Sequence, residues 1–356
     1  MTSTLIEQRL SNQGLTQPRH RRAADVVEWL GAVQAQEYEP AKWGLGQRMK
    51  DGGDAAVERE FEQGRILRTH VMRPTWHFVA AADIRWMQML TAPRVLRTLA
   101  TYDRRMELDT PTRTRATRIF ERVLRDHQYL TRAELGDRLR RSGLTISGMR
   151  LAFAAAHAEL RAVICSGPRR GKHSTYALVA ERAPNARELS RDEALAELTR
   201  RFFRSHGPAT VRDFVWWSGL PTADARRGLE INRAERQTVD GYTYWTVGSA
   251  GARAPNRAGV CLLPVYDEYV VAYRDRTLVP HGPSKVAAGA GQSVTFQHAL
   301  VIAGRIAGTW RITRGPRAVS IAVTPLRRLT ASEKSGVAAA ALRYERFLGI
   351  PIVMRT

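Results

Sequence analysis

The sequence predicts an α+β fold: three tandem winged-helix units, then a small C-terminal β-barrel and a terminal helix. Two stretches about 79 residues apart, aligned on Thr131 and Thr210, repeat the order helix, turn, helix and hairpin, and a looser copy precedes them. After residue 258 the apolar period changes to two, which is typical of strands. We expect four domains: 1–110 (first unit and a connecting helix), 111–187 (second unit), 188–255 (third unit) and 256–356 (barrel and terminal helix).

The second unit has the clearest pattern. Thr131 and Glu134 are spaced as a capping box, and the helix that they begin ends at Gly143. A second helix is expected over 147–161. Residues 163–179 then alternate around a Gly- and Pro-containing turn, as a two-stranded hairpin does.

The third unit follows the same order. Thr210 and Asp213 predict a helix start, and a second helix begins near Thr222. Asp240-Gly241 between two alternating runs predicts a tight hairpin turn.

The first unit is the looser copy. Helices are expected over 21–33 and 55–63, and a hairpin over 64–79. An arginine-dense helical segment, 83–126, joins this unit to the second.

The C-terminal region is predicted as a small antiparallel sheet or barrel closed by a helix. The helix begins with the capping box of Thr330 and Glu333 and ends at Leu348, before Gly349. Residues 280–292 are rich in small side chains and form either a loop at a binding channel or a plain surface loop. The strand-like runs are 259–273, 298–313 and 317–326.

The charge of the chain predicts a nucleic-acid partner. Lys and Arg number 56 against 34 Asp and Glu, a net charge of +22, and 51 of the 56 are arginines. Each phosphate that such a surface neutralises releases counterions and strengthens binding at low salt. A GC-rich genome also explains the choice of arginine over lysine, but it explains the net charge less well.

Several classes of site are disfavoured. Cys165 and Cys261 lie in separate apolar runs without zinc-site or disulfide spacing, and we expect inert core thiols. Phosphate-loop, metalloprotease and α/β-hydrolase motifs are missing, so no metal or cofactor is expected. No apolar run approaches the ~20 residues of a membrane span. We expect a monomer in the cytoplasm, associated with the nucleoid.

Two glutamines stand where an apolar helix pattern ends. In a continued helix Gln34 and Gln36 would point about 200° apart, because each residue advances ~100°. Pro40 disfavours the α conformation at Glu39, so we expect the helix to break between Val33 and Glu39. In extended backbone the two amides face the same way and can hold a water or grip a sugar-phosphate. The spacing alone favours the simpler interpretation, that they are ordinary polar residues at a helix end.

The chain resembles the AlkZ and YcaQ family of bacterial DNA glycosylases over most of its length. The family's Gln-aliphatic-Gln motif is matched by Gln34-Ala35-Gln36, which favours the AlkZ branch over the Gln-x-Asp of the YcaQ branch. Pro74 and Trp76 depart from the family pattern. The segments that carry the resemblance are LGAVQAQEYEPAKWGLGQRM, LRTHVMRPTWHFV and CLLPVYDEYVVAYRDR.

The resemblance implies a fold of three winged helices and a barrel, and a glycosylase that removes bulky or crosslinked N7-alkylated purines. The partner of such an enzyme would be duplex DNA that carries alkylated guanine or adenine. Its role would be DNA repair, or self-resistance in organisms that produce DNA-alkylating antibiotics. Gln34 and Gln36 would be catalytic, orienting water and contacting the deoxyribose. Lys42 is the one lysine close to the motif, so Schiff-base chemistry is disfavoured and a monofunctional enzyme is expected.

Other residues are candidates for support or DNA contact. His77 is either a structural histidine or a catalytic aid. Asp267 either stabilises developing charge or forms a structural bridge with Arg274 or Arg276. An open basic channel suits bulky adducts better than a tight pocket. The candidate phosphate contacts are Arg65, Arg68, Arg73, Arg169, Arg170, Lys172, Lys285, Arg311, Arg314 and Arg317.

Two other functions are compatible with the pattern. A winged-helix transcription regulator would read DNA through its second helix, but that helix in the second unit is largely apolar. A protein that binds alkylated DNA without releasing a base is the other alternative.

Overall fold

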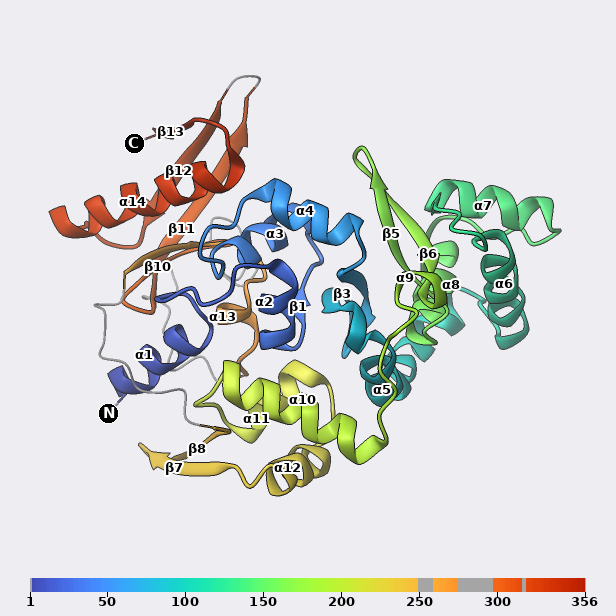
Figure 1. Cartoon of the computed structure of the whole chain (residues 1–356), viewed down its shortest axis with the longest axis horizontal. Helices are drawn as coiled ribbons and strands as arrows, with labels where there is room; N and C mark the ends of the chain where they lie inside the picture. Colours follow the sequence, from blue (N-terminus) through green and yellow to red (C-terminus); the bar gives the residue numbers. More distant parts are fainter. Residues whose placement is uncertain (1, 249–258, 275–296, 316–317, 356) are drawn as a thin grey trace.

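The computed structural model describes residues 2–248, 259–274, 297–315 and 318–355. Three segments repeat one order of elements: a helix, a short strand, two helices and a hairpin (Figure 1). In the first segment these are α2 (Ala23–Leu30), β1 (Val33–Gln34), α3 (Tyr38–Gly46), α4 (Asp54–Glu62), β2 (Ile66–Val71) and β3 (Arg73–Ala80). We call this segment the first unit. α3 was not among the predicted helices.

The second unit repeats the topology of the first. Its elements are α6 (Thr110–Val123), β4 (Leu130–Thr131), α7 (Arg132–Arg141), α8 (Gly148–Leu160), β5 (Ile164–Arg170) and β6 (His173–Leu178). The short strand pairs with the second hairpin strand in both units, giving sheet orders β1-β3-β2 and β4-β6-β5.

In the third unit the short strand is reduced to a single bridge between Ala209 and Trp245. Asp240 and Gly241 both take positive φ, 51° and 78°, as the predicted Asp-Gly turn requires. The elements are α10 (Arg191–Ser205), α11 (Val211–Ser218), α12 (Thr222–Ile231), β7 (Glu235–Val239) and β8 (Tyr242–Thr246).

The predicted capping boxes are confirmed. Thr131, Thr210 and Thr330 each accept a hydrogen bond from the backbone N–H three residues on, and the acidic residue there accepts one in return. The predicted helix starts therefore agree with the structure to within a residue.

The arginine-dense connection consists of η1 (Ala81–Asp83), α5 (Ile84–Arg105) and then α6 of the second unit. α5 lies between all three units in Figure 1. Asp83 and Arg201, each at most 2% exposed, form a buried ion pair between this connection and α10. Removing one partner of such a buried pair is strongly destabilising. The pair therefore fixes the connection after the first unit against helix α10 of the third unit.

The C-terminal strands form a five-stranded sheet in the order β13-β12-β11-β10-β9, with β13 parallel to β12. Among the described residues β9 and β13 are the sheet edges, so closure into a barrel stays a prediction. Residues 268–271, expected as strand, form the short helix α13 (Glu268–Val271). The strands and terminal helix are β9 (Val260–Leu263), β10 (His298–Ile302), β11 (Arg305–Arg314), β12 (Val319–Pro325), α14 (Ala331–Leu348) and β13 (Ile352–Arg355). The loop 280–292 lies outside the described residues.

Two buried clusters meet at the sheet of the first unit. Phe78 faces a core shared with the C-terminal sheet and α14, where Trp43 packs on Phe347 at 5.1 Å between ring centroids. Val79 faces a core shared with α5 and the third unit. The second unit has a core of its own, and α1 (Thr2–Asn12), which was not predicted, packs against α13 and the C-terminal sheet. None of the described helices is both long and apolar enough to span a membrane.

Candidate active site

The backbone is extended at the glutamine motif. The chain leaves α2 at Gly31, whose φ of 88° is left-handed and whose Cβ, if present, would lie 3.3 Å from Trp217. β1 then pairs antiparallel with β3, with Gln34 opposite His77. The predicted break is confirmed, although it comes earlier than expected. Pro40 is not its cause, because Pro40 lies in the first turn of α3, where proline is tolerated.

The two glutamines share one side of this strand. Val33 and Ala35 enter the core shared with the C-terminal sheet, which leaves Gln34 and Gln36 on the other side because side chains alternate. Gln34 is 8% exposed and accepts a hydrogen bond from Arg73 Nη2 at 2.9 Å through its Oε1. Gln36 is half-buried, and its Oε1 accepts from the Trp76 backbone N–H at 3.4 Å.

Glu268 is the buried carboxylate of the site. Its Oε1 accepts from the Gln34 backbone N–H at 2.8 Å, and its Oε2 accepts from Trp217 Nε1 at 2.9 Å. His206 Nε2 lies 3.4 Å from the same Oε2. Burial raises the pKa of Glu268, but the His206 and Gln34 hydrogen bonds and the charge of Arg73 outweigh it and lower the pKa to about 2. Glu268 is therefore a fixed negative charge behind the motif.

Arg73 is the positive group of the site, and the neutral His77 lies beside it. Burial, and then the charge of Arg73, lower the pKa of His77 to about 3, so the imidazole is neutral. His77 Nδ1 donates to the Thr75 carbonyl at 2.9 Å, which turns Nε2 toward Arg73 Nη2 at 3.5 Å. His77 thus lies against the guanidinium that donates to Gln34.

Arg68 donates hydrogen bonds to the backbone of the glutamine motif. Its Nε donates to the Ala35 carbonyl at 2.8 Å and its Nη2 to the Gln36 carbonyl at 3.2 Å, while the guanidinium stacks 4.5 Å from the Trp76 ring centroid. The sequence placed Arg68 and Arg73 among phosphate contacts on the wing. Both guanidinium groups are half-buried and turn to the glutamine motif, so their contact with phosphates stays a prediction.

The other predicted DNA contacts are spread over three elements. Arg169 of β5 reaches Glu39 at 2.9 Å, and Arg314 of β11 lies 3.9 Å from the same carboxylate. Arg170 pairs with Glu134 at 2.7 Å. Arg65, Lys172 and Arg311 are exposed, and Lys285 and Arg317 lie outside the described residues. The structure therefore brings Arg169 and Arg314 together beside the motif and leaves the others apart.

Asp267 is a structural bridge, with a partner that differs from the predicted ones. Its two carboxylate oxygens each accept from Arg48 at 2.8 Å, and the pair is almost wholly buried. Asp267 also caps α13 by accepting from the Tyr269 N–H at 2.9 Å. Arg274 is not part of this bridge, which fixes the helix that carries Glu268, and Arg276 lies outside the described residues.

Lys42 is locked among carboxylates. Its Nζ lies 2.8 Å from Glu58, 3.0 Å from Asp54 and 3.0 Å from Glu39. Burial lowers the pKa of Lys42, but these three carboxylates outweigh it and raise the pKa above the usual value. A permanently protonated amine cannot act as a nucleophile.

A cavity of about 570 Å³ opens beside the motif, between the first and second units. Its lining from the first unit includes Tyr38, Arg68 and Trp76, and its lining from the second includes Tyr176 and Lys172. The cavity therefore combines aromatic walls with cationic groups next to Gln36.

His206 and Arg48 had no sequence signature of their own. Among the described residues no group of three or more His, Cys, Asp or Glu side chains is placed to hold a metal ion. Cys165 and Cys261 are free and buried, and burial raises their pKa values to about 12 and about 11. Their expected role as inert core thiols agrees with this burial.

The fold and site define a basic α+β protein whose candidate catalytic groups are neutral amides over a buried carboxylate. Comparison with known proteins then places the family: residues 27–347 match the family described as DNA glycosylase AlkZ-like, and the chain belongs to that family.

Two relatives come from Streptomyces sahachiroi. The chain is 25% identical over 332 residues to an interstrand DNA cross-link repair glycosylase, covering 85% of this chain and 86% of that protein. The solved structure of the DNA glycosylase AlkZ aligns with a TM-score of 0.79 at 23% identity and covers 99% of both chains. That likeness confirms the mixed α+β fold.

Proposed function

We propose that this protein is a DNA glycosylase that hydrolyses the N-glycosidic bond of N7-alkylated purines and leaves an abasic site. The observation that carries the proposal is the pair of amides, Gln34 and Gln36, held in extended backbone next to the buried, ionised Glu268.

The substrate supplies most of the chemical driving force. Alkylation at N7 gives the purine a positive charge, so the base leaves as a neutral molecule when the bond from C1′ to N9 breaks and the electron pair stays on N9. Water then adds to C1′ and its proton passes to solvent. The protein needs to expose C1′, orient the water and favour the oxocarbenium-like charge, and positioning of this kind is worth several kcal/mol.

The site residues fit these tasks. Arg73 holds Oε1 of Gln34, so the remaining lone pair and the NH₂ group have a fixed direction. Gln36 lies on the same side, and together the amides orient the water and contact the deoxyribose. Glu268 contributes a preorganised negative charge behind them, while Asp267 and His77 act by positioning.

The enzyme is proposed to be monofunctional. Lyase chemistry needs an unprotonated amine that attacks C1′, and Lys42 is held as an ammonium by three carboxylates. Base release would therefore end at the abasic site.

The cavity between the first and second units supports bulky adducts as substrates. It lies beside Gln36, and its aromatic walls suit a planar substituent carried by the purine. The cross-link repair glycosylase named among the relatives makes interstrand crosslinks a second substrate class. A role in self-resistance to DNA-alkylating natural products follows from the same chemistry.

The three repeated units are proposed to act as winged helices that place a monomer on duplex DNA in the nucleoid. The repeated order of elements and the sheet orders β1-β3-β2 and β4-β6-β5 support this architecture.

The test is base release from duplexes that carry one N7-methylguanine or one bulky N7-alkylguanine at a defined position. The protein is incubated in molar excess over the DNA, and abasic sites are detected by strand cleavage in alkali. We expect alkali-labile sites with both lesions, faster for the bulky one, and no strand cleavage before alkali.

Two other results of this assay would indicate a different class of protein. A protein that binds the lesion tightly and releases no base is a damage-binding protein. One that binds unmodified palindromic DNA as a dimer and releases no base is a regulator.

A further inference from the structure

A basic pocket lies on the third unit, apart from the glutamine motif. It measures about 950 Å³ and lies between the start of α11, the helix α12 and the β7–β8 hairpin. Trp217, which contacts Glu268, is near the other end of α11, six residues from Val211 at the pocket. At ~1.5 Å of rise per residue the pocket is roughly 9 Å farther along the helix.

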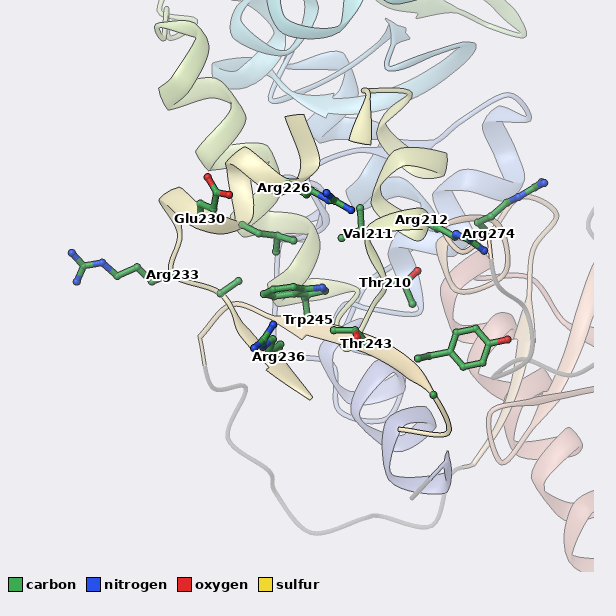
Figure 2. Close-up of a pocket in the computed structure, with 14 residues that line it drawn as sticks. Thr210, Val211, Arg212, Arg226, Glu230, Arg233, Arg236, Thr243, Trp245 and Arg274 are labelled. Carbon is green, nitrogen blue, oxygen red and sulfur yellow. The ribbon is translucent and has the colours of Figure 1, made fainter. Parts of the chain in front are cut away.

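Five arginines line this pocket, and Glu230 is the one acidic residue among the 14 that do so. They come from separate places in the chain: one from α11, one from α12, one from the turn after α12, one from β7 and one from the segment after α13. Figure 2 shows them distributed around Trp245. The five are Arg212, Arg226, Arg233, Arg236 and Arg274.

These arginines differ from others in the same unit. Two other arginines of the unit are paired: Arg191 with Asp224 at 2.7 Å, and Arg227 with Asp192 at 3.1 Å. Within the part of the chain that the structure describes, none of the five pocket arginines forms an ion pair, although Arg274 stacks on Trp216 at 5.2 Å. Like charges that line one pocket without counterions repel one another, so this arrangement favours an anionic ligand.

The ligand has to be larger than a single small anion. The pocket that the five arginines line measures about 950 Å³, and the half-buried indole of Trp245 gives it an apolar wall. Planar guanidinium groups suit bidentate binding of phosphate oxygens, and an indole face suits a deoxyribose between two phosphates.

We infer that this pocket is a second DNA-backbone site, in which the third unit grips consecutive phosphates of the strand while the glutamine motif holds the lesion. The inference rests on the proposed function for its choice of DNA as the polyanion. The site contributes affinity without touching the reacting atoms, so it acts through salt-dependent binding.

The first test is DNA affinity as a function of salt, measured by fluorescence anisotropy with the full chain. The variant replaces three pocket arginines, Arg226→Gln, Arg233→Gln and Arg236→Gln. Each lost phosphate contact lowers the slope of log K against log salt by about 0.9, so we expect the slope to fall by about 2 to 3. The matched control replaces Arg191→Gln and Arg227→Gln, whose guanidinium groups are already paired, and its slope stays near that of the wild type. Equal slopes for the pocket variant and the wild type overturn the inference.

The second test uses the unmutated protein, so it does not depend on variants that fold. Arginines are labelled with phenylglyoxal and read by mass spectrometry, alone, with micromolar duplex and with millimolar inorganic phosphate. Protection of Arg226, Arg233 and Arg236 by duplex supports the inference. Protection by phosphate but not by duplex, or no protection at all, overturns it.

Base release separates this inference from the proposed function. If the wild type releases no base while duplex still protects the pocket arginines, the glycosylase proposal fails and the DNA site stands. If the wild type releases base and the pocket variant keeps the wild-type salt slope, the glycosylase proposal stands and the inference of a second DNA site fails.

Discussion

The first and second units have the same topology and use it differently. Each has a two-residue strand that pairs with the second hairpin strand, Gln34 opposite His77 in the first and Leu130 opposite Tyr176 in the second. In the second unit the short strand leads into a capping box through Thr131, so its polar group serves the local fold. In the first unit α3 has no side-chain cap, and Gln34 and Gln36 pair instead with Arg73 and the Trp76 backbone N–H.

The difference comes from what packs against each unit. The second unit has its own core, whereas the sheet of the first lies between two shared cores. Only the first therefore receives Glu268 from α13 and Trp217 from α11 behind its short strand. A repeated scaffold acquires a site where neighbouring units supply buried charge.

The largest effect is expected at the motif itself. Gln34→Ala or Gln36→Ala removes an amide that orients the water, and misplacement of this kind costs about 100-fold or more in single-turnover base release. Gln128→Ala, an exposed glutamine shortly before β4, is the control and keeps the wild-type rate. Wild-type rates in both motif variants would mean that the reacting site lies elsewhere.

The second-largest effect is expected at Glu268, which lies behind the short strand of the first unit and has no counterpart described for the second. Glu268→Ala removes the acceptor of the Gln34 N–H and the Trp217 Nε1–H, and breaking such a buried pairing costs about 3 to 5 kcal/mol of unfolding free energy. Glu268→Gln keeps one acceptor oxygen, so it should be more stable than the alanine variant yet slower than wild type in base release.

Urea unfolding and single-turnover kinetics measure the two effects, with exposed Glu188→Ala as control. A glutamine variant as fast as the wild type would show that the charge of Glu268 has no catalytic role.

The buried His77 gives the site a pH dependence of stability. Its folded pKa of about 3 lies below the usual 6.5, so the unfolded chain takes up a proton below pH 6.5 that the native imidazole refuses. The free energy of unfolding should fall as pH drops from 6.5 to 5, by up to about 1.4 kcal/mol per pH unit for this group. His77→Gln should flatten the dependence, and exposed His173→Gln should not. Equal slopes in all three proteins would contradict a neutral, buried His77.

The smallest effect is expected at the cap of the second unit. Thr131→Ala removes the side-chain acceptor for the Glu134 N–H and should lower the unfolding free energy by about 1 kcal/mol. Thr145→Ala, on an exposed threonine in the loop before α8, is the control. A loss as large as that of Glu268→Ala would mean that the two units do not differ in the way described.

Local patterns were sufficient for most of the fold. The capping boxes, the Asp240-Gly241 turn and the alternating hairpins agree with the structure because each depends on neighbouring residues. Helix α3 was missed because Pro40 was interpreted as a breaker rather than a first-turn residue. The strand β13 was missed because its partner β12 is distant in sequence and its alternation is short.

The candidate site was predictable only in part. The extended break at the glutamines follows from local geometry, and the choice of Gln34 and Gln36 came from the motif. The contacts of Arg68 and Arg73 could not be predicted, because an arginine on a strand is compatible both with a phosphate contact and with a buried hydrogen bond to a neighbouring strand. His206 has no sequence pattern that links it to Glu268.

The sequence by itself determined the order of helices and hairpins, the strong positive charge and the position of the two amides, because these depend on composition and on residues a few places apart. The tertiary structure alone decided that Glu268 lies behind Gln34, that Asp267 pairs with Arg48, and that five arginines line one pocket with Trp245. These contacts join residues up to more than 200 positions apart, and only the packing of shared cores brings them together.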